Sequence, residues 1–312
     1  MVPGRTGGSS EVSPVGEIVM AVKATHVPSM LLSELPGAAH GCREPAIAAE
    51  RDFGRRAAER GVDTFVVFDT HWLVNAGYHI NNNAVHKGNY TSHEFPHFVQ
   101  DLGYDFPGNP QLGRLIAEEA TAAGVKTRAH EVPSLDLEYG TILPMRYMNP
   151  QGRMGVVSVA GWSTFGSLEE SRVVGEAIAR AVARSDSKVA LVASGSLSHQ
   201  IWENHLVEQG FNTISREFNR QVDLRVLQLW EAGDWPAFLS LLPEYAETCS
   251  GEGRMHDTAM LFGALGWDRY RGRSQILCPY FASSGTGQTI VEFSVDGIPQ
   301  PEPAAGPATP VS

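Results

Sequence analysis

The stretch "TFVVFDTHW", residues Thr64 to Trp72, places a histidine directly after a run of apolar, β-branched and aromatic residues. A short run that is apolar on both faces is typical of a buried parallel strand. The strand that we predict here spans Asp63 to Thr70. Three more runs have the same character: Glu17 to Thr25, Gly155 to Gly161 and Lys188 to Gly195. These four runs predict the centre of one sheet.

Helical patterns lie between the strand-like runs, at residues 44–61, 109–124 and 167–185. The second begins with Asn109 and a proline, and the third has the spacing of a capping box, with Ser167 and Glu170 three residues apart. Such alternation predicts an α/β fold, a central mostly parallel sheet flanked by helices. After Leu206 the pattern is helical as far as residue 267, and two late strands, Ser274 to Ala282 and Thr289 to Val295, predict an antiparallel extension.

The composition is that of an ordinary globular protein, with 42% hydrophobic and 19% charged residues in 312. A formal net charge of -11 without a Lys/Arg run argues against nucleic acid or an anionic membrane as a partner. The three scattered cysteines, Cys42, Cys249 and Cys278, argue against a disulfide scaffold and favour a reducing, cytoplasmic location. No signal peptide or long apolar run is present, so we expect a soluble protein without a membrane segment.

The two ends of the chain, residues 1–15 and 298–312, are rich in Pro, Gly, Ala and Ser. Segments of this composition bury too little apolar area to offset the entropy of ordering, so we predict that both are disordered. Between them, residues 16–297 show no linker or repeat, which predicts a single domain.

Three histidines fall at predicted strand ends: His26 in "THVPSM", His71 in "DTHW" and His199 in "SGSLSH". Ligands of open α/β sheets bind outside the carboxyl ends of the strands. One such histidine is more often a packed residue, but three at one edge of a sheet weaken that interpretation. Glu252, between two glycines in "CSGEGRMHD", is the best candidate carboxylate, although a solvated loop glutamate is the simpler interpretation. His26, His71 and Glu252 would suit non-heme Fe(II), while a zinc hydrolase can use similar ligands.

Other motifs carry weaker signals. His93 and His97 are four residues apart, but Pro96 between them breaks the helix that would align them, so we interpret them as structural residues or as part of a pocket wall. The run "SGSLSH" lacks the closing glycine of a serine-hydrolase elbow, and "SSGTGQ" (residues 283–288) fits a tight turn better than a phosphate site.

Five segments together resemble the LigB-type (class III) extradiol ring-cleaving dioxygenases: "THVPSM", "FDTHW", "EYGTILPMRYMN", "SGSLSH" and "GEGRMHDTAMLFGALGW". The resemblance runs from about Gly16 to about Phe293. It implies that the single domain is a catalytic LigB-like domain that binds Fe(II) through His26, His71 and Glu252 and uses His199 as the acid/base residue. It also implies a small aromatic substrate, O₂ as co-substrate and a homo-oligomer.

Within the family the likeness is greatest to members that cleave 3,4-dihydroxyphenylacetate to 5-carboxymethyl-2-hydroxymuconate semialdehyde. One departure is informative, because many members have D-H-G where this chain has Glu138, Tyr139 and Gly140. We expect the Tyr139 hydroxyl to face the substrate or oxygen. Aminophenol-cleaving relatives share the Y-G-T stretch, so 2-aminophenol or another catechol acid remains an alternative substrate. A Memo-like metal-binding or partner-binding protein is the alternative outside catalysis.

An acetate side chain on the substrate needs a cationic partner. Arg43, Arg146 and Arg254 are the candidates, because guanidinium binds carboxylate through two parallel hydrogen bonds; for each of them a surface ion pair is the competing interpretation. His97 is a further candidate for substrate contact. Asp69, two residues before His71, is predicted to orient an imidazole.

Overall fold

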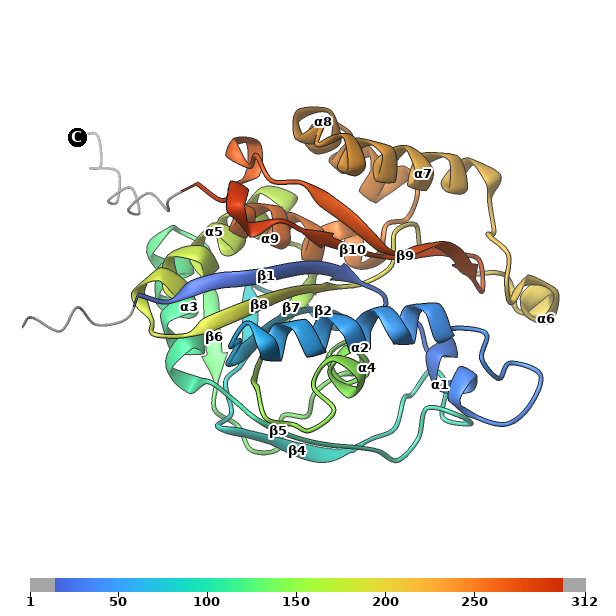
Figure 1. The fold of residues 1–312 in the computed structure, drawn as a ribbon, viewed down its shortest axis with the longest axis horizontal. Coiled ribbons are helices and arrows are strands. Elements are labelled where there is room, and N and C mark those ends of the chain that lie inside the picture. The colour runs from blue at the N-terminus through green and yellow to red at the C-terminus, as the bar shows by residue number, and fades with distance from the viewer. Residues whose placement is uncertain (1–14, 300–312) are drawn as a thin grey trace, which may run out of the picture.

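The structure, a computed structural model, describes residues 15–299 and has one eight-stranded mixed sheet with helices on both faces (Figure 1). The strand order is β6-β3-β7-β2-β8-β1-β10-β9. The four strands β7, β2, β8 and β1 run parallel, while β10 and β9 extend the sheet in antiparallel fashion. The predicted α/β fold is therefore confirmed. Apart from Val15, Ile298 and Pro299, the two predicted disordered ends lie outside the described residues.

The strands have the following bounds: β1 Glu17–Ala24, β2 Thr64–Val74, β3 Tyr78–Asn81, β4 Val85–Tyr90, β5 Leu102–Pro107, β6 Thr127–His130, β7 Gly155–Ser163, β8 Lys188–Ser194, β9 Ser274–Ser283 and β10 Thr286–Phe293. The α-helices are α1 Ser29–Glu34, α2 Glu44–Glu59, α3 Pro110–Ala122, α4 Tyr139–Met148, α5 Leu168–Arg184, α6 Val207–Gly210, α7 Glu217–Ala232, α8 Trp235–Thr248 and α9 His256–Leu265.

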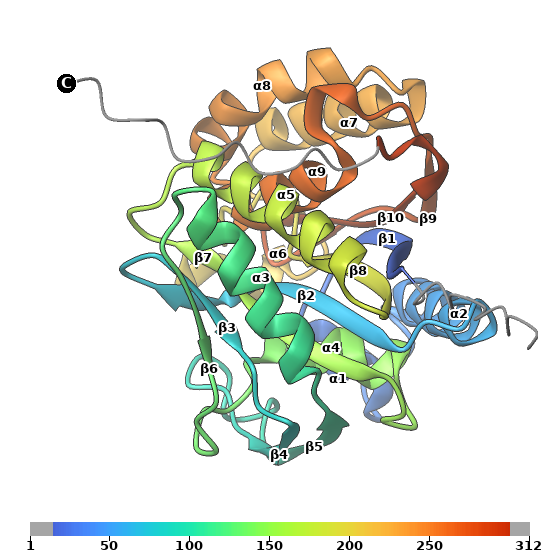
Figure 2. The ribbon, with the colours of Figure 1, turned by 90° about the vertical axis from the view of Figure 1, so that its left-hand side faces the viewer.

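Two hydrophobic cores lie on opposite faces of the sheet, and β2 shows why. Its side chains alternate, so that Val66 and Phe68 join the core under α3, α5 and α9, while Phe65 and Val67 join the core under α2 and α4. Figure 2 shows α3 and α5 crossing one face, with α2 and α4 on the other. The central strands are apolar on both faces because both faces are covered.

The predicted caps are present. Asn109 accepts a hydrogen bond from the backbone N–H of Leu112 at the start of α3, and Ser167 and Glu170 form a complete capping box at the start of α5. The turn in "SSGTGQ" is also confirmed, because Ser284 and Gly285 connect β9 to β10 with φ angles of 50° and 95°.

Strand β2 differs from the prediction in one important respect. It does not end at Thr70 but continues to Val74, and its register against β7 shifts between Asp69 and Leu73. Its pairing with β8 ends at Asp69 opposite Ser194. His71 therefore lies in a bulge beyond the doubly paired part of the strand.

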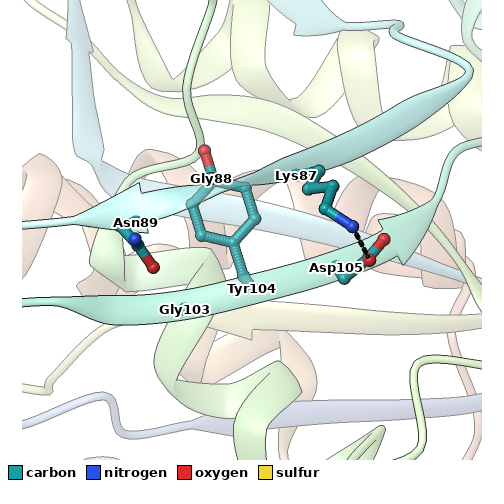
Figure 3. Close-up of a pocket in the computed structure, with 6 residues that line it drawn as sticks. All are labelled: Lys87, Gly88, Asn89, Gly103, Tyr104 and Asp105. Carbon is teal, nitrogen blue, oxygen red and sulfur yellow. Dashed lines mark hydrogen bonds and ion pairs between the residues drawn. The ribbon is translucent and has the colours of Figure 1, made fainter.

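The short strands β3 and β6, the helices α1 and α4, and the hairpin of β4 and β5 were not predicted. The hairpin lies below α4 (Figure 1). Figure 3 shows its outer surface, where Lys87 Nζ lies 2.7 Å from Asp105 Oδ2 beside a shallow hollow of about 450 Å³. None of the candidate site residues lines this hollow. Among residues 15–299, no helix combines the length and apolar character that a membrane crossing requires.

Candidate metal centre

Three predicted ligands meet at the carboxyl edge of the sheet, beside the ends of β1 and β8 and the bulge of β2. His26 follows β1, His71 lies in the β2 bulge, and Glu252 begins the short helical turn before α9. One ligand atom from each lies within 4.8 Å of the other two. Within the described part of the chain, this is the one such group of three His, Cys, Asp or Glu residues.

The distances within the group are close to those around a single ion. His26 Nε2 lies 2.9 Å and His71 Nε2 lies 3.6 Å from the same oxygen, Glu252 Oε1. The two imidazole rings are nearly perpendicular, at 81° with centroids 4.9 Å apart. Neighbouring ligand atoms on an ion at about 2.1 Å are roughly 3 Å apart, so small shifts would place all three on one cation.

A hydrogen-bond chain fixes the ring of His26. Its Nδ1 lies 2.9 Å from Ser194 Oγ, and Ser194 donates its own hydrogen to the carbonyl oxygen of Gly140 in α4. Because the Ser194 proton is used there, its oxygen accepts the Nδ1–H of His26. Nε2, which faces Glu252 Oε1 at 2.9 Å, is then the nitrogen that would bind a metal ion.

The carboxylate of Glu252 is buried and held at both oxygens. Thr70 donates its hydroxyl to Oε1 at 2.7 Å, and the backbone N–H of Ser196 donates to Oε2. Burial raises the pKa of Glu252, but the nearby imidazoles of His26 and His199 outweigh it and hold that pKa well below its usual value. The group is therefore a buried carboxylate aimed inward and not the solvated loop glutamate that was the simpler interpretation of the sequence.

Backbone geometry explains how Glu252 reaches the centre. Gly253 has a φ of 54°, and a Cβ there would lie 2.8 Å from Thr70 Cγ2. Ser250, Arg254 and Met255 also have positive φ angles, which cost non-glycine residues on the order of 1–2 kcal/mol each. Of the two glycines on which the prediction rested, Gly253 uses its conformational freedom, whereas Gly251 has a φ of -50°.

His71 is held through its backbone rather than through its ring. Its N–H donates to Asp69 Oδ1 at 2.8 Å, and the other oxygen of Asp69 accepts from the Thr141 hydroxyl at 2.6 Å. The prediction that Asp69 would orient an imidazole is therefore wrong. Its carboxylate accepts a backbone N–H and stabilises the bulge instead. Burial, followed by the charge of His26, lowers the pKa of His71 to about 3, so the ring is neutral.

His199 lies across the centre, with Nε2 3.9 Å from Glu252 Oε2. Its segment pairs directly with the segment of Glu252: the N–H of His199 donates to Ser250 O at 3.0 Å, and the N–H of Glu252 donates to Leu197 O at 3.2 Å. The side chain of His199 keeps 28% of its surface exposed, so a ligand in the centre could reach it.

Tyr139 covers one side of the centre. Its ring lies over His71 with centroids 3.8 Å apart, and its hydroxyl donates to Glu94 Oε2 at 3.1 Å. Glu94 belongs to the "SHEFPHF" segment, which also contains His97. His97 itself is exposed and packs edge-on against Phe98. The segment thus lies beside the site, and substrate contact by His97 stays a prediction.

The three candidate arginines have different environments. Arg43 is buried and donates to the hydroxyls of Ser29 and Ser283, and Arg146 is paired with Glu34 at the rim of a separate cavity of about 540 Å³. Arg254 is exposed, two residues after Glu252; its backbone N–H donates to Gly251 O at 2.9 Å, and its guanidinium has no hydrogen bond or ion pair with any described side chain. Of the three, Arg254 is the one free to bind a ligand.

Several supporting residues were not predicted. Thr70, Ser194 and Thr141 make the hydrogen bonds described above, and a buried ion pair of Lys23 with Asp257 lies beneath the turn at Gly195. Their one sequence signal is polarity at the ends of apolar runs. That signal does not say which side chain a hydroxyl will reach.

The chain matches known proteins over most of its length. A family model described as "Catalytic LigB subunit of aromatic ring-opening dioxygenase" matches residues 20–294. A 3,4-dihydroxyphenylacetate 2,3-dioxygenase of Escherichia coli is 51% identical over 270 residues, which cover 86% of this chain and 98% of that protein. A 2-aminophenol 1,6-dioxygenase beta subunit of Pseudomonas sp is 26% identical over 299 residues, covering 90% and 95% of the two chains.

A solved structure supports the fold. The crystal structure of an uncharacterized protein from Escherichia coli K12 superposes with a TM-score of 0.57 over 80% of this chain and 92% of that one. The sequences are 16% identical, so this likeness concerns the fold alone.

Proposed function

We propose that this chain, which belongs to the LigB family of catalytic subunits of aromatic ring-opening dioxygenases, cleaves 3,4-dihydroxyphenylacetate beside its hydroxyl pair. The product would be 5-carboxymethyl-2-hydroxymuconate semialdehyde, with both atoms of O₂ incorporated. The observation that carries the proposal is the meeting of His26, His71 and Glu252 at one point, with His199 facing them. The 51% identity to a protein of that name supports the substrate.

The donor set fits Fe(II). Two imidazole nitrogens and one carboxylate oxygen are the facial set used by non-heme iron oxygenases, and three coordination positions stay open. Bound Fe(II) would supply the electron transfer between catechol and O₂, for which Zn²⁺ has no redox chemistry. The protein's part is to present His71 neutral and Glu252 ionised, as the direction of their pKa shifts favours, while His26 would lose its proton when the ion binds.

His199 is the residue that moves a proton. Imidazole both accepts and donates near neutral pH, and the 3.9 Å gap to Glu252 places Nε2 beside any group held in the centre. It would accept a proton from a catechol hydroxyl and return it later in the turnover. Its partial exposure leaves room for the substrate ring.

Two further residues shape the substrate site. Tyr139 provides an aromatic wall against His71 and a hydroxyl that can exchange Glu94 for a substrate oxygen. Arg254 would bind the acetate carboxylate, because its guanidinium is exposed and has no partner among the described side chains.

The test is anaerobic reconstitution with Fe(II), followed by addition of 3,4-dihydroxyphenylacetate and air. We expect oxygen uptake and a yellow product, and no turnover with Zn²⁺ in place of iron. A yellow product with 2-aminophenol alone would select the alternative substrate. No oxygen uptake and no yellow product with either compound would favour a Memo-like role without ring cleavage. A cytoplasmic location and a homo-oligomer stay predictions.

A further inference from the structure

Asp223 in α7 is a fully buried carboxylate that the proposed chemistry does not use. It accepts four hydrogen bonds: from the Ser198 N–H at 3.2 Å, the Ser198 hydroxyl at 2.7 Å, the Tyr245 hydroxyl at 2.7 Å and the Tyr280 hydroxyl at 2.9 Å. Burial of a charge costs several kcal/mol unless it is well bonded, and an apolar residue would pack α7 at less cost. The carboxylate therefore calls for an explanation beyond packing.

Two of the four bonds hold Ser198, the residue before His199. The backbone of Ser198 is held on other sides as well, because its carbonyl accepts from the Gly287 N–H at 2.9 Å and it forms an antiparallel bridge with Gly251. Asp223 thus completes a clamp that joins α7, β10 and the Glu252 segment around one residue. The hydroxyl of Ser198 is engaged in this clamp, which agrees with the low expectation of a serine nucleophile.

Gly287 keeps the space that this carboxylate occupies. A Cβ at position 287 would lie 2.0 Å from Asp223 Oδ2 and 2.8 Å from the Tyr280 hydroxyl. The glycine is one of those in "SSGTGQ" that fit no phosphate site. Without a side chain at this position, β10 can approach the clamp. The glycine and the carboxylate of Asp223 therefore depend on each other.

We propose that Asp223 is a positioning residue, which fixes Ser198 and thereby the direction in which His199 presents its ring to the metal centre. Among the described side chains, the His199 ring has no hydrogen bond of its own, and its one charged neighbour, Glu252 Oε2, is 3.9 Å away. Its direction therefore depends on the backbone that Asp223 clamps. The inference rests on the proposed role of His199.

The test compares Asp223→Asn and Ser198→Ala with Tyr270→Phe. Tyr270→Phe is the control. Like Ser198→Ala it removes a buried hydroxyl, but this one donates to Ser294 O at 2.7 Å and lies outside the clamp. Each variant is measured for bound iron, KM, kcat and its pH profile. The His199 ring is followed separately by NMR in the metal-free protein, with the signal assigned from His199→Asn.

For Asp223→Asn we expect wild-type iron content, a KM within about twofold, and a kcat lower by roughly 10–100-fold, because small misplacements of a catalytic group cost that much. Ser198→Ala should lose several-fold in kcat. The His199 signal and its titration should move in both variants and stay unchanged in Tyr270→Phe.

Unchanged kcat and NMR signal in Asp223→Asn would overturn the proposal. A lower kcat with an unmoved His199 signal would also overturn it. So would a Tyr270→Phe control whose iron content, KM and kcat change as much as those of Asp223→Asn, since both results indicate a general structural role. If Asp223→Asn does not fold, Ser198→Ala decides by the same criteria. If the wild type cleaves no catechol, the proposed function fails, while the NMR comparison still decides whether Asp223 directs His199.

Discussion

The ring of Tyr139 lies over the imidazole of His71, with centroids 3.8 Å apart and planes inclined by 36°. One face of a predicted metal ligand is therefore covered by the residue that replaces a histidine common elsewhere in the family. The contact uses the ring of Tyr139, while its hydroxyl is engaged by Glu94. The two roles proposed for this side chain can be separated by substitution.

Tyr139→Phe keeps the ring and removes the hydroxyl. We expect wild-type iron content and a kcat/KM lower by about tenfold, the value of one hydrogen bond to a charged or reacting group. Tyr139→Ala removes the ring as well and should weaken iron binding by about 10–100-fold, as loss of a group that orients a ligand does. Metal analysis with oxygen-uptake kinetics measures both, and weak iron binding in Tyr139→Phe would contradict the division of roles.

His199→Asn removes the proton carrier and leaves the three ligands in place. Iron content should stay at the wild-type level while kcat falls by roughly 10²–10⁴-fold. His205→Asn is the matched control, because His205 lies on the same connecting segment with 70% of its side chain exposed. Full activity of His199→Asn would rule out the acid/base assignment.

Glu252→Gln keeps the size of the side chain but removes the charge that three imidazoles surround. We expect iron affinity to fall at least about tenfold, because a neutral amide is a poor ligand for a divalent cation. Titration of the metal-free protein with Fe(II) under anaerobic conditions gives the affinity. Glu203→Gln, at a site with 80% side-chain exposure, should bind iron as the wild type does.

Arg254→Gln tests recognition of the substrate carboxylate. The KM for 3,4-dihydroxyphenylacetate should rise about tenfold, which corresponds to roughly 1.4 kcal/mol, while the KM for 4-methylcatechol stays the same. Arg146→Gln is the control, since Arg146 is already paired with Glu34. Equal KM changes for the acidic and the neutral catechol would remove Arg254 from this role.

His256 should make the protein less stable in mild acid. Burial, followed by the charge of Arg254, lowers the pKa of His256 to about 4, and its Nδ1 is 2.6 Å from Ser171 Oγ. The unfolded chain binds a proton below pH 6.5 and the folded chain below pH 4, so stability is lost as pH falls between these values, by up to about 3 kcal/mol. Urea unfolding at pH 7.5 and pH 5 measures this loss. The loss should be smaller in His256→Asn and unchanged in His205→Asn.

The sequence predicted the parts of the fold that depend on repeated local patterns. Long apolar runs such as Thr64 to Phe68 identify central strands, and Asn109 and Ser167 identify helix starts. The strands β3 and β6 have four residues each, too few for a periodic signal. Helix α4 was missed because it contains Pro144 and is buried on nearly all sides, so it has no polar face.

The meeting of the three predicted ligands follows from topology, which brings strand ends together, whereas the residues that hold them in place were not predicted. Asp69 was expected at an imidazole and instead accepts the amide of His71, a contact that depends on the bulge. The clamp of Asp223 on Ser198 joins residues 25 positions apart through tertiary packing. A contact between residues so far apart in the sequence leaves no local sequence pattern.

The bulge in β2 separates the stability of the sheet from that of the site. Hydrogen bonding between β2 and β8 ends at Asp69, so the segment that carries His71 can open without breaking any bond of that ladder. Amide hydrogens of β2 before Asp69 should exchange with solvent only on global unfolding, while those of the bulge exchange through a smaller local opening. We expect binding of a metal ion, proposed above to be Fe(II), to slow exchange in the bulge and to leave exchange in β2 before Asp69 unchanged.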